Sequence, residues 1–339
     1  MIRSLTSLRF LFAIMIFMHH YKVNDSSLFP EGYLGVTFFF ILSGFVLSLN
    51  ACRYNLQAER KEFILKRLSK LYPLHLLCLC IALFSGSVFI CKQIILNVLL
   101  LQSWTPRACF SYNAVSWCLS DQIFFYICFP FLVYVLQKLT LRMQFCYVLI
   151  QIVLILIASL IVPPKYNHFI FYICPLVRLS DFILGIILCN IYRYVVDRQL
   201  IARTRFKANT CETISILILF LFIFISGYVP QFYRYGLFYW IPMSLLIMTF
   251  AYFDKCGGWF SSLLSHHILV KLGSASFCFY MLHLLCFRLR SIVTISEIWQ
   301  IECFVLFVFV SILSLLCHKY FERPIDKYLR RKINNNDSL

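Results

Sequence analysis

Ten long apolar stretches dominate this chain of 339 residues and restrict it to folds that cross a lipid bilayer. Hydrophobic residues make up 61% of the sequence and charged residues 13%, whereas a water-soluble protein is about half apolar and a quarter charged. This composition excludes a cytosolic enzyme, a disordered chain and a secreted disulfide scaffold. Because about 20 apolar residues span a bilayer, we expect an all-α, polytopic integral membrane protein with about ten transmembrane helices. The stretches lie at about 5–21, 33–50, 71–91, 115–137, 145–162, 176–196, 211–229, 233–253, 268–287 and 301–318.

Two further segments complete the organisation of the chain. The apolar run at 94–103 is too short to span a bilayer and predicts a short re-entrant or interfacial helix. The apolar N-terminus is not typical of a cleaved signal peptide, because Arg9 interrupts it and no small-residue cleavage site follows. We therefore expect an uncleaved first helix, a single transmembrane domain over 1–332 and a polar C-terminal tail over 333–339.

The lysines and arginines orient the chain in the membrane. If the N-terminus is cytoplasmic, the inner segments carry 23 of them and the outer segments 7, with Arg178 inside a helix. This asymmetry follows the positive-inside rule and predicts that both termini are cytoplasmic. The net charge of +17 does not indicate a nucleic-acid partner, because the basic residues border apolar runs.

The 16 cysteines contain no C-x-x-C pair. Many of them lie inside apolar runs, where a thiol behaves as a small hydrophobic group. We therefore expect neither a metal nor a disulfide framework.

Ionisable residues inside apolar spans are costly, so each of them is a candidate for function. Arg9 and His20 are eleven residues apart in the first span, which places both on one helix face about 16 Å apart along its axis. Arg9 then lies near the inner membrane surface and His20 near the outer surface. The alternative is that Arg9 reaches the lipid headgroups and His20 only caps the helix.

Counting about 1.5 Å per residue from the helix ends gives the height of each other candidate. His20 lies about 22 Å above the inner edge, His283 about 18 Å and Asp121 about 21 Å, within a hydrocarbon core about 30 Å thick. Asp181 falls in the same layer, but it is three residues from Arg178, and a structural ion pair explains it at least as well as catalysis.

A cationic cluster lies at the inner foot of the third span, at the level of Arg9. It consists of Lys66, Arg67 and Lys70. Arginine suits phosphate because its fork donates two hydrogen bonds, and a histidine and a carboxylate on the opposite side could transfer protons. This polarity suits a reaction with a cytoplasmic, polyanionic donor and an acceptor outside.

These residues lie in motifs that resemble one family. The pattern is carried, in order, by SLTSLRFLFAIMIFMHHY (4–21), GVTFFFILSGFVLS (35–48), FILKRLSKLYPLHLL (63–77), WCLSDQIFFYICFP (117–130), RLSDFILG (178–185), SFCFYMLH (276–283) and YFERP (320–324). Together they resemble the acyltransferase-3 family of bacterial integral-membrane acyltransferases, which modify O-antigen and other envelope glycans. The sequence departs from the family pattern at Gln122, where a glutamate is usual, and at Lys70, where an arginine is usual.

The resemblance implies an O-acyltransferase of the bacterial inner membrane that moves an acyl group, most simply acetyl from acetyl-CoA, to a hydroxyl of an envelope or lipid-linked carbohydrate. Metal is not implied, and assembly into a homo-oligomer is left open. The catalytic residues would be His20 as general base or transient acyl carrier, Asp121 as the group that orients an imidazole, and His283 as the group that polarises the thioester or assists proton transfer. Acyl-CoA would bind to Arg9, Lys66, Arg67 and Lys70. Supporting roles fall to Ser43, Gly44, Trp117, Ser120, Gln122, Arg178, Asp181 and Glu322.

Two residue groups have simpler explanations. Ser43 and Gly44 suit close helix packing better than nucleophilic chemistry. Trp117 and the tyrosines Tyr112, Tyr166 and Tyr172 could stack on sugar rings, although an ordinary interfacial aromatic belt explains the tyrosines better.

A membrane transporter or exporter of a glycan or lipid-linked intermediate is the main alternative function. Such a protein would also need many helices and buried charge, but it usually shows inverted halves with broken helices, and this sequence has no such symmetry. A structural scaffold would have little reason to place histidine and aspartate in hydrocarbon. The sequence leaves open the acceptor sugar, the acyl length and whether a covalent acyl-enzyme forms.

Overall fold

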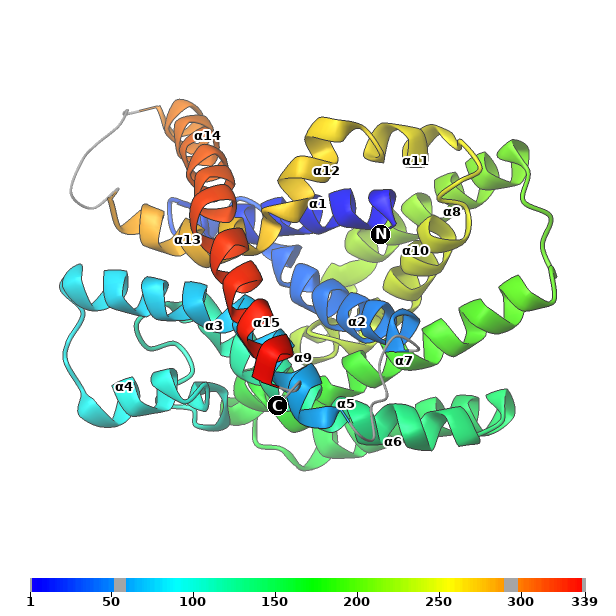
Figure 1. Cartoon of the computed structure of the whole chain (residues 1–339), viewed down its shortest axis with the longest axis horizontal. Coiled ribbons are helices and arrows are strands. Elements are labelled where there is room, and N and C mark those ends of the chain that lie inside the picture. The colour runs from blue at the N-terminus through cyan, green and yellow to red at the C-terminus, as the bar shows by residue number, and fades with distance from the viewer. Residues whose placement is uncertain (1, 52–58, 290–297, 337–339) are drawn as a thin grey trace.

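The computed structural model describes residues 2–51, 59–289 and 298–336, and this part of the chain is almost entirely helical (Figure 1). Two-residue strands β1 (Lys22–Val23) and β2 (Ser26–Ser27) form a small antiparallel hairpin. The helices are α1 (Arg3–His20), α2 (Leu34–Leu49), α3 (Arg60–Phe84), α4 (Cys91–Val98), α5 (Trp117–Lys138), α6 (Leu141–Ile161), α7 (Pro175–Asp197), α8 (Arg205–Ile225), α9 (Gln231–Arg234), α10 (Trp240–Tyr252), α11 (Trp259–Leu264), α12 (His267–Ser274), α13 (Ser276–Leu289), α14 (Trp299–Cys317) and α15 (Arg323–Asn336).

Every predicted apolar stretch contains a helix, but the count of ten spans is not confirmed. Within the described residues, seven helices are long and apolar enough to cross a membrane, or eight if α12 and α13, which meet at a bend of 64°, form one broken span. Two of the predicted spans are outside this count. Helix α1 is long enough but too polar, since it carries Arg9 and several serines, threonines and histidines, and α10 is too short, with only 13 residues. The run at 94–103 contributes α4, which has eight residues and is too short to span.

Helix α1 runs across the middle of the molecule and contacts α2, α12 and α13 (Figure 1). Its polar residues at the N-terminal end are satisfied by neighbouring segments: Ser4 Oγ donates to Asp254 Oδ1 at 2.8 Å and Ser7 Oγ to Leu264 O at 2.5 Å. Phe12 and Phe17 are each only 1% exposed. Because both faces of α1 are packed, its two ends have fixed positions in the fold.

Glycines allow the closest helix pair, α2 and α7, to pack backbone to backbone. A Cβ on Gly44 would lie 2.0 Å from Phe182 O, and a Cβ on Gly185 would lie 2.0 Å from Ile41 O. In a membrane the hydrophobic effect does not drive helices together, so their association depends on close van der Waals packing. Small residues allow this close packing. Gly44 therefore fixes the position of α2, which carries Ser43 toward the interior.

The C-terminal helices leave the bundle through an unusual joint. A π-helical turn, His318–Glu322, connects α14 to α15, and α15 passes over α3 (Figure 1). Single π-turns of this kind are frequently found at functional sites. The turn places Glu322 near the N-terminal end of α1.

Replacing Gly44 with valine tests the packing of α2 on α7. The new side chain has no room against Phe182 O, so we expect a loss of about 1–3 kcal/mol of stability, typical of overpacking. The measurement is the temperature at which half of the detergent-solubilised protein remains monodisperse. Gly227→Ala is the matched control, since nothing lies within 4 Å of its added Cβ; equal stability of the two variants would contradict the packing role.

Candidate active site

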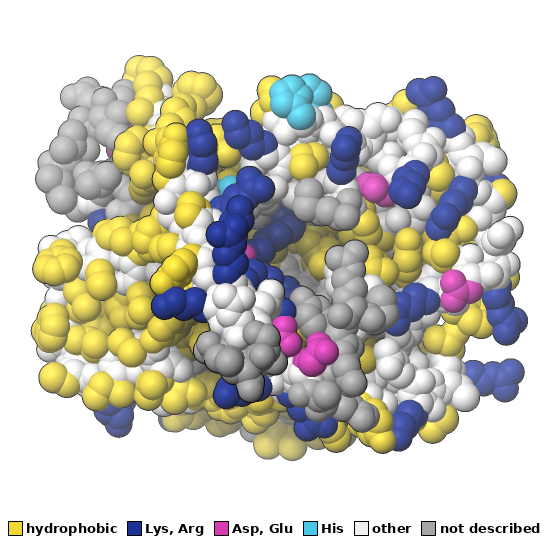
Figure 2. All heavy atoms as spheres, in the orientation of Figure 1, with side chains coloured by type: hydrophobic (Ala, Val, Ile, Leu, Met, Phe, Trp, Pro, Cys, Tyr) yellow, Lys and Arg dark blue, Asp and Glu magenta, His cyan; other side chains and the backbone are white. Residues whose placement is uncertain are grey.

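Two adjoining cavities open beside α1. The narrow cavity has a volume of about 170 Å³ and the wide cavity about 1230 Å³. Both are lined by Arg9, Leu42, Val46 and Lys70, so the two meet at the N-terminal half of α1 and at the basic part of α3. In Figure 2, Lys and Arg side chains gather around a hollow near the middle of the face that α15 crosses.

The cations of these cavities lack a full set of protein partners. Among the residues that the structure describes, Arg9, Arg67 and Lys70 form no close ion pair, and the Arg67 Nε atom is buried without a hydrogen bond. Among the carboxylates, Glu322 has the strongest electrostatic interaction with Arg9 and with Lys70. All three side chains are half-buried. A partly desolvated cation without an ion-pair partner is costly, so three of them around one cavity form a site suited to an anionic ligand.

Lys66 does not join this group. Its ammonium forms an ion pair with Glu62 one turn earlier in α3, and it lines neither of the two cavities. The predicted basic cluster of four is therefore reduced to three residues at the cavities, Arg9, Arg67 and Lys70.

The polar motif residues of α2 and α5 line the deeper part of the narrow cavity. Ser43 and Gln122 both face it, and the Tyr126 hydroxyl contacts Gln122 Oε1 at 3.5 Å. Gln122 is the position where a glutamate is usual in the resembling family. An uncharged amide beside three cations leaves the positive charge of the cavity uncompensated.

His20 and His283 meet at the other end of α1. His20 Nδ1 lies 3.2 Å from His283 Nε2 and 2.9 Å from Ile16 O, and His283 Nδ1 lies 2.6 Å from Tyr280 O. His283 is fully buried, whereas His20 is partly exposed. The structure thus brings together two of the three predicted catalytic residues.

The carbonyl contacts fix the tautomer of each ring. A carbonyl oxygen only accepts, so Nδ1 of His283 carries a hydrogen toward Tyr280 O and its Nε2 is an acceptor when the ring is neutral. Nδ1 of His20 then donates to Ile16 O and to His283 Nε2 together. His20 Nε2 consequently bears the lone pair, and no hydrogen bond within the described chain occupies it.

The narrow cavity approaches the histidines without including them. Its lining reaches Phe39 and Tyr280, whose rings lie 6.3 Å apart, but neither His20 nor His283 lines either cavity. Tyr280 precedes His283 by less than one turn of α13. In the part of the chain that the structure describes, neither cavity therefore connects the cations to the imidazoles.

Asp121 lies apart from the two histidines. It is fully buried near the start of α5, its charged neighbours are Arg178 and Asp181, and the hydrogen bonds of His20 and His283 go elsewhere. The orienting role predicted for Asp121 is filled in this geometry by backbone carbonyls. Its neighbour Ser120 shares a 2.7 Å hydrogen bond with Ser103, also in the interior.

Arg178 and Asp181 form a buried pair held by three further groups. Their side chains are 2.9 Å apart and almost fully buried. Arg178 also donates to Tyr235 O and, at 3.0 Å, to Thr37 Oγ1, and Trp240 Nε1 donates to Asp181 Oδ1 at 2.5 Å. The pair therefore ties α7 to α2 and α10, which is the structural role that their spacing suggested.

Trp117 packs inside the bundle rather than on its rim. It is 2% exposed, and its ring lies 4.8 Å from that of Tyr172 and 6.2 Å from that of Phe40.

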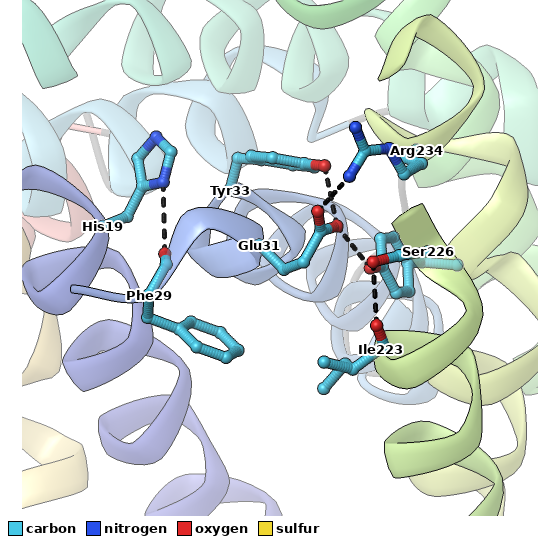
Figure 3. A network of polar contacts seen from close by, with 8 residues as sticks. His19, Phe29, Glu31, Tyr33, Ile223, Ser226 and Arg234 are labelled. Atoms are coloured by element: carbon cyan, nitrogen blue, oxygen red, sulfur yellow. Dashed lines mark hydrogen bonds and ion pairs between the residues drawn. The ribbon is translucent and has the colours of Figure 1, made fainter. Parts of the chain in front are cut away.

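A second charged network stabilises the segment that follows α1 (Figure 3). Glu31 forms an ion pair with Arg234 and accepts hydrogen bonds from Tyr33 at 2.7 Å and Tyr239 at 2.6 Å. These residues lie outside the motifs of the sequence, and Glu31 and Arg234 are 203 positions apart. The network anchors the segment next to His19 and His20 to the α9–α10 region.

Several cavity residues were also missed. Tyr126 and Tyr280 line the narrow cavity, and Lys271 and His318 line the wide cavity. Both tyrosines lie inside recognised motifs, so the motif segments themselves were the available signal. Lys271 and His318 come from helix ends that only the tertiary fold brings to α1.

Comparison with known proteins identifies the class of protein. The sequence model of an acyltransferase domain family matches residues 2–318, nearly the whole chain. The chain therefore belongs to the acyltransferase-3 family, as its motifs indicated. It is also similar to the acyltransferase MdmB of Streptomyces mycarofaciens, with 28% identity over 323 residues that cover 84% of this chain and 79% of the relative. No solved structure matches.

Replacing Asp181 with asparagine tests the buried pair. Arg178 would keep its charge without a counter-ion, and losing one partner of a buried ion pair costs about 3–5 kcal/mol. We expect a clear fall in the thermal stability of the purified protein. Glu62→Gln removes an ion pair at a more exposed site and should cost at most about 1 kcal/mol; a stability loss equal to that of Asp181→Asn would contradict this account.

Proposed function

We propose that this protein is a multi-pass membrane O-acyltransferase that moves an acyl group from acyl-CoA to a hydroxyl of an envelope or lipid-linked carbohydrate. Membership of an acyltransferase family supports acyl transfer. The observation that carries the rest is the pairing, within the described residues, of three cations without an ion-pair partner, around the N-terminal half of α1, with an imidazole at its C-terminal end whose Nε2 is free. Acetyl from acetyl-CoA is the simplest donor that satisfies this arrangement.

The donor's phosphates bind at Arg9, Arg67 and Lys70. Coenzyme A carries several phosphate charges at one end and a thioester at the end of a slender arm, so its charged end fits the wide cavity and its arm the narrow cavity. The narrow cavity is lined mostly by apolar side chains beyond the cations, including Val36, Phe40 and Leu119. The excess of basic residues predicted at the cytoplasmic surface is consistent with a cytoplasmic donor.

His20 is the general base in the proposed reaction. Its Nε2 takes the proton of the acceptor hydroxyl as the oxygen attacks the thioester carbonyl. The new C–O bond forms, the C–S bond breaks, and the coenzyme A thiolate leaves with the proton that the imidazolium returns. Ile16 O and His283 Nε2 both accept from Nδ1–H of His20, so they favour the imidazolium that forms in between.

His283 is better suited to position His20 than to polarise the thioester. Its Nδ1–H is committed to Tyr280 O, and its neutral Nε2 accepts rather than donates. Donation to a carbonyl oxygen would require protonation of a fully buried ring.

The acceptor approaches from the aromatic side of His20. Rings of His19, Tyr33, Tyr172, Tyr235 and His168 form a contiguous group with neighbouring centroids 4.8–6.2 Å apart. His168 is exposed, so the group reaches the surface. Tyr33 and Tyr235 are buried, so a sugar ring would meet the group at its exposed end, at His168, and an aromatic face there supports a carbohydrate acceptor.

The thioester reaches His20 in this scheme when Phe39 and Tyr280 move. These two side chains belong to the end of the narrow cavity nearest the histidines. Binding of the pantetheine arm supplies the contacts that favour the open arrangement, because a ligand shifts a conformational equilibrium through its preference for one state.

Coenzyme A binding tests the donor site. In Arg67→Ala we expect the loss of one charge-assisted hydrogen bond to a phosphate. The free energy of coenzyme A binding then falls by about 1.5–3 kcal/mol, which corresponds to roughly 10–100-fold weaker binding. The measurement is calorimetric titration of the purified protein with coenzyme A at fixed salt. Lys66→Ala is the matched control from the same helix, and a loss of affinity equal to that of Arg67→Ala would refute the assignment of these cations.

Acyl transfer by His20→Ala tests the general base. We expect transfer to fall by about 10²–10⁴-fold, the usual contribution of such a group, while coenzyme A binding stays unchanged. The measurement follows radiolabelled acyl groups from acyl-CoA into glycan in membranes with matched amounts of protein. His267→Ala, an exposed histidine on α12, should retain full activity. Undiminished transfer by His20→Ala would remove this residue from the mechanism.

A further inference from the structure

A group of metal-ligating side chains lies where α13 meets the π-helical turn between α14 and α15. Cys278 Sγ lies 3.0 Å from Glu322 Oε2, and His318 Nδ1 lies 2.8 Å from the same oxygen. One potential ligand atom from each residue lies within 4.8 Å of the other two. The thiol of a fourth residue, Cys317, interacts with that of Cys278.

We propose that Cys278, His318 and Glu322 form a binding site for a divalent, zinc-like cation. A sulfur, a nitrogen and a carboxylate oxygen are the ligand types that zinc takes in proteins. Zinc bonds of about 2.0–2.3 Å place tetrahedral ligand atoms about 3.3–3.8 Å apart, so separating the two close contacts by less than 1 Å accommodates the ion. Cys317 or a water completes the tetrahedron.

Burial and access both suit a bound ion. Cys278 is fully buried and Glu322 is 5% exposed, so water reaches their polar atoms poorly and a bound ion would satisfy both. His318 and Glu322 line the wide cavity, which gives the ion a path from solvent. A plausible metal site requires suitable ligands, suitable distances and an access path, and this cluster has all three.

The charge of the surroundings is also compatible with the site. Arg9, Lys70, Lys319 and Arg323 lie around the wide cavity and would repel an isolated cation. A divalent ion bound by a thiolate and a carboxylate is electrically neutral, since the two ligands balance its charge. Coordination itself deprotonates the Cys278 thiol, as a bound metal ion does with other coordinating thiols.

Metal binding would change the neighbouring anion site, which is formed by Arg9, Arg67 and Lys70. Glu322 supplies the acidic influence on Arg9 and Lys70, so coordination of its carboxylate leaves these two cations with more uncompensated charge. A metal ion bound at Cys278, His318 and Glu322 therefore raises the affinity of the anion site for its ligand. This consequence rests on the proposed function, whereas metal binding itself does not.

Cobalt and zinc titrations of the purified full-length protein test the site. The protein carries no histidine tag, is stripped with chelator and is kept reduced. We expect one equivalent of Co²⁺ per chain with a thiolate-to-cobalt absorption band, and displacement of that band by Zn²⁺. Cys278→Ser should lose the band and bind Zn²⁺ at least tenfold more weakly.

Two further variants make the result decisive. Cys286→Ser alters another buried cysteine of α13 and should leave the spectrum and the affinity unchanged. His318→Ala changes a more exposed ligand and should weaken binding at least tenfold even if Cys278→Ser does not fold. Absence of a bound equivalent, absence of the thiolate band, or wild-type affinity in His318→Ala would each overturn the proposal. A metal site without altered coenzyme A affinity would overturn only its link to the anion site.

Discussion

The cost of burying charge among apolar helices governs this structure. A lone charge in such surroundings is strongly destabilising, so a buried ionisable group needs a partner or a ligand. Arg178 meets this requirement through Asp181, Tyr235 and Thr37, and Glu31 meets it through Arg234 and two tyrosines. These satisfied networks join helices that are distant in the sequence.

Within the described residues, three cations that do not meet this requirement internally define the donor part of the active-site candidate, whereas Asp121, a fully buried carboxylate that also lacks a hydrogen bond, lies apart from them. Arg9 and Lys70 line both adjoining cavities, Arg67 lines the narrow one, and Glu322 is the main acidic group that acts on Arg9 and Lys70. At the other end of α1, carbonyl oxygens fix the hydrogen positions of His20 and His283 and leave His20 Nε2 available. Helix α1 links the proposed donor site to the proposed base because it carries residues of both.

The sequence predicted features that depend on local pattern. Hydropathy located a helix in every apolar stretch, and the i, i+3 spacing of Arg178 and Asp181 correctly suggested an ion pair. The sequence also placed Arg9 and His20 on one helix, and α1 contains both, with His20 as its last residue. The count of spans was harder, because α10 is short and α12 and α13 are bent.

Features that depend on contacts between helices could not be read in this way. Heights along a helix axis placed Asp121 in the same layer as the histidines, but lateral position in the bundle puts it near Arg178 instead. Lys66 belongs to the basic run of α3, yet its side chain reaches Glu62 and not the cavity. Cys278 and Glu322 lie in two separate motifs 44 positions apart, and no spacing in the sequence indicates that the two side chains meet.

The most direct test of the central claim is an experimental structure of the protein bound to a non-hydrolysable thioether analogue of acyl-CoA. The account predicts phosphate density against Arg9, Arg67 and Lys70, the pantetheine arm in the narrow cavity, displaced Phe39 and Tyr280 side chains, and the acyl carbon beside His20 Nε2. Coenzyme A bound at another surface, or an acyl group that remains remote from His20 in the bound state, would contradict it.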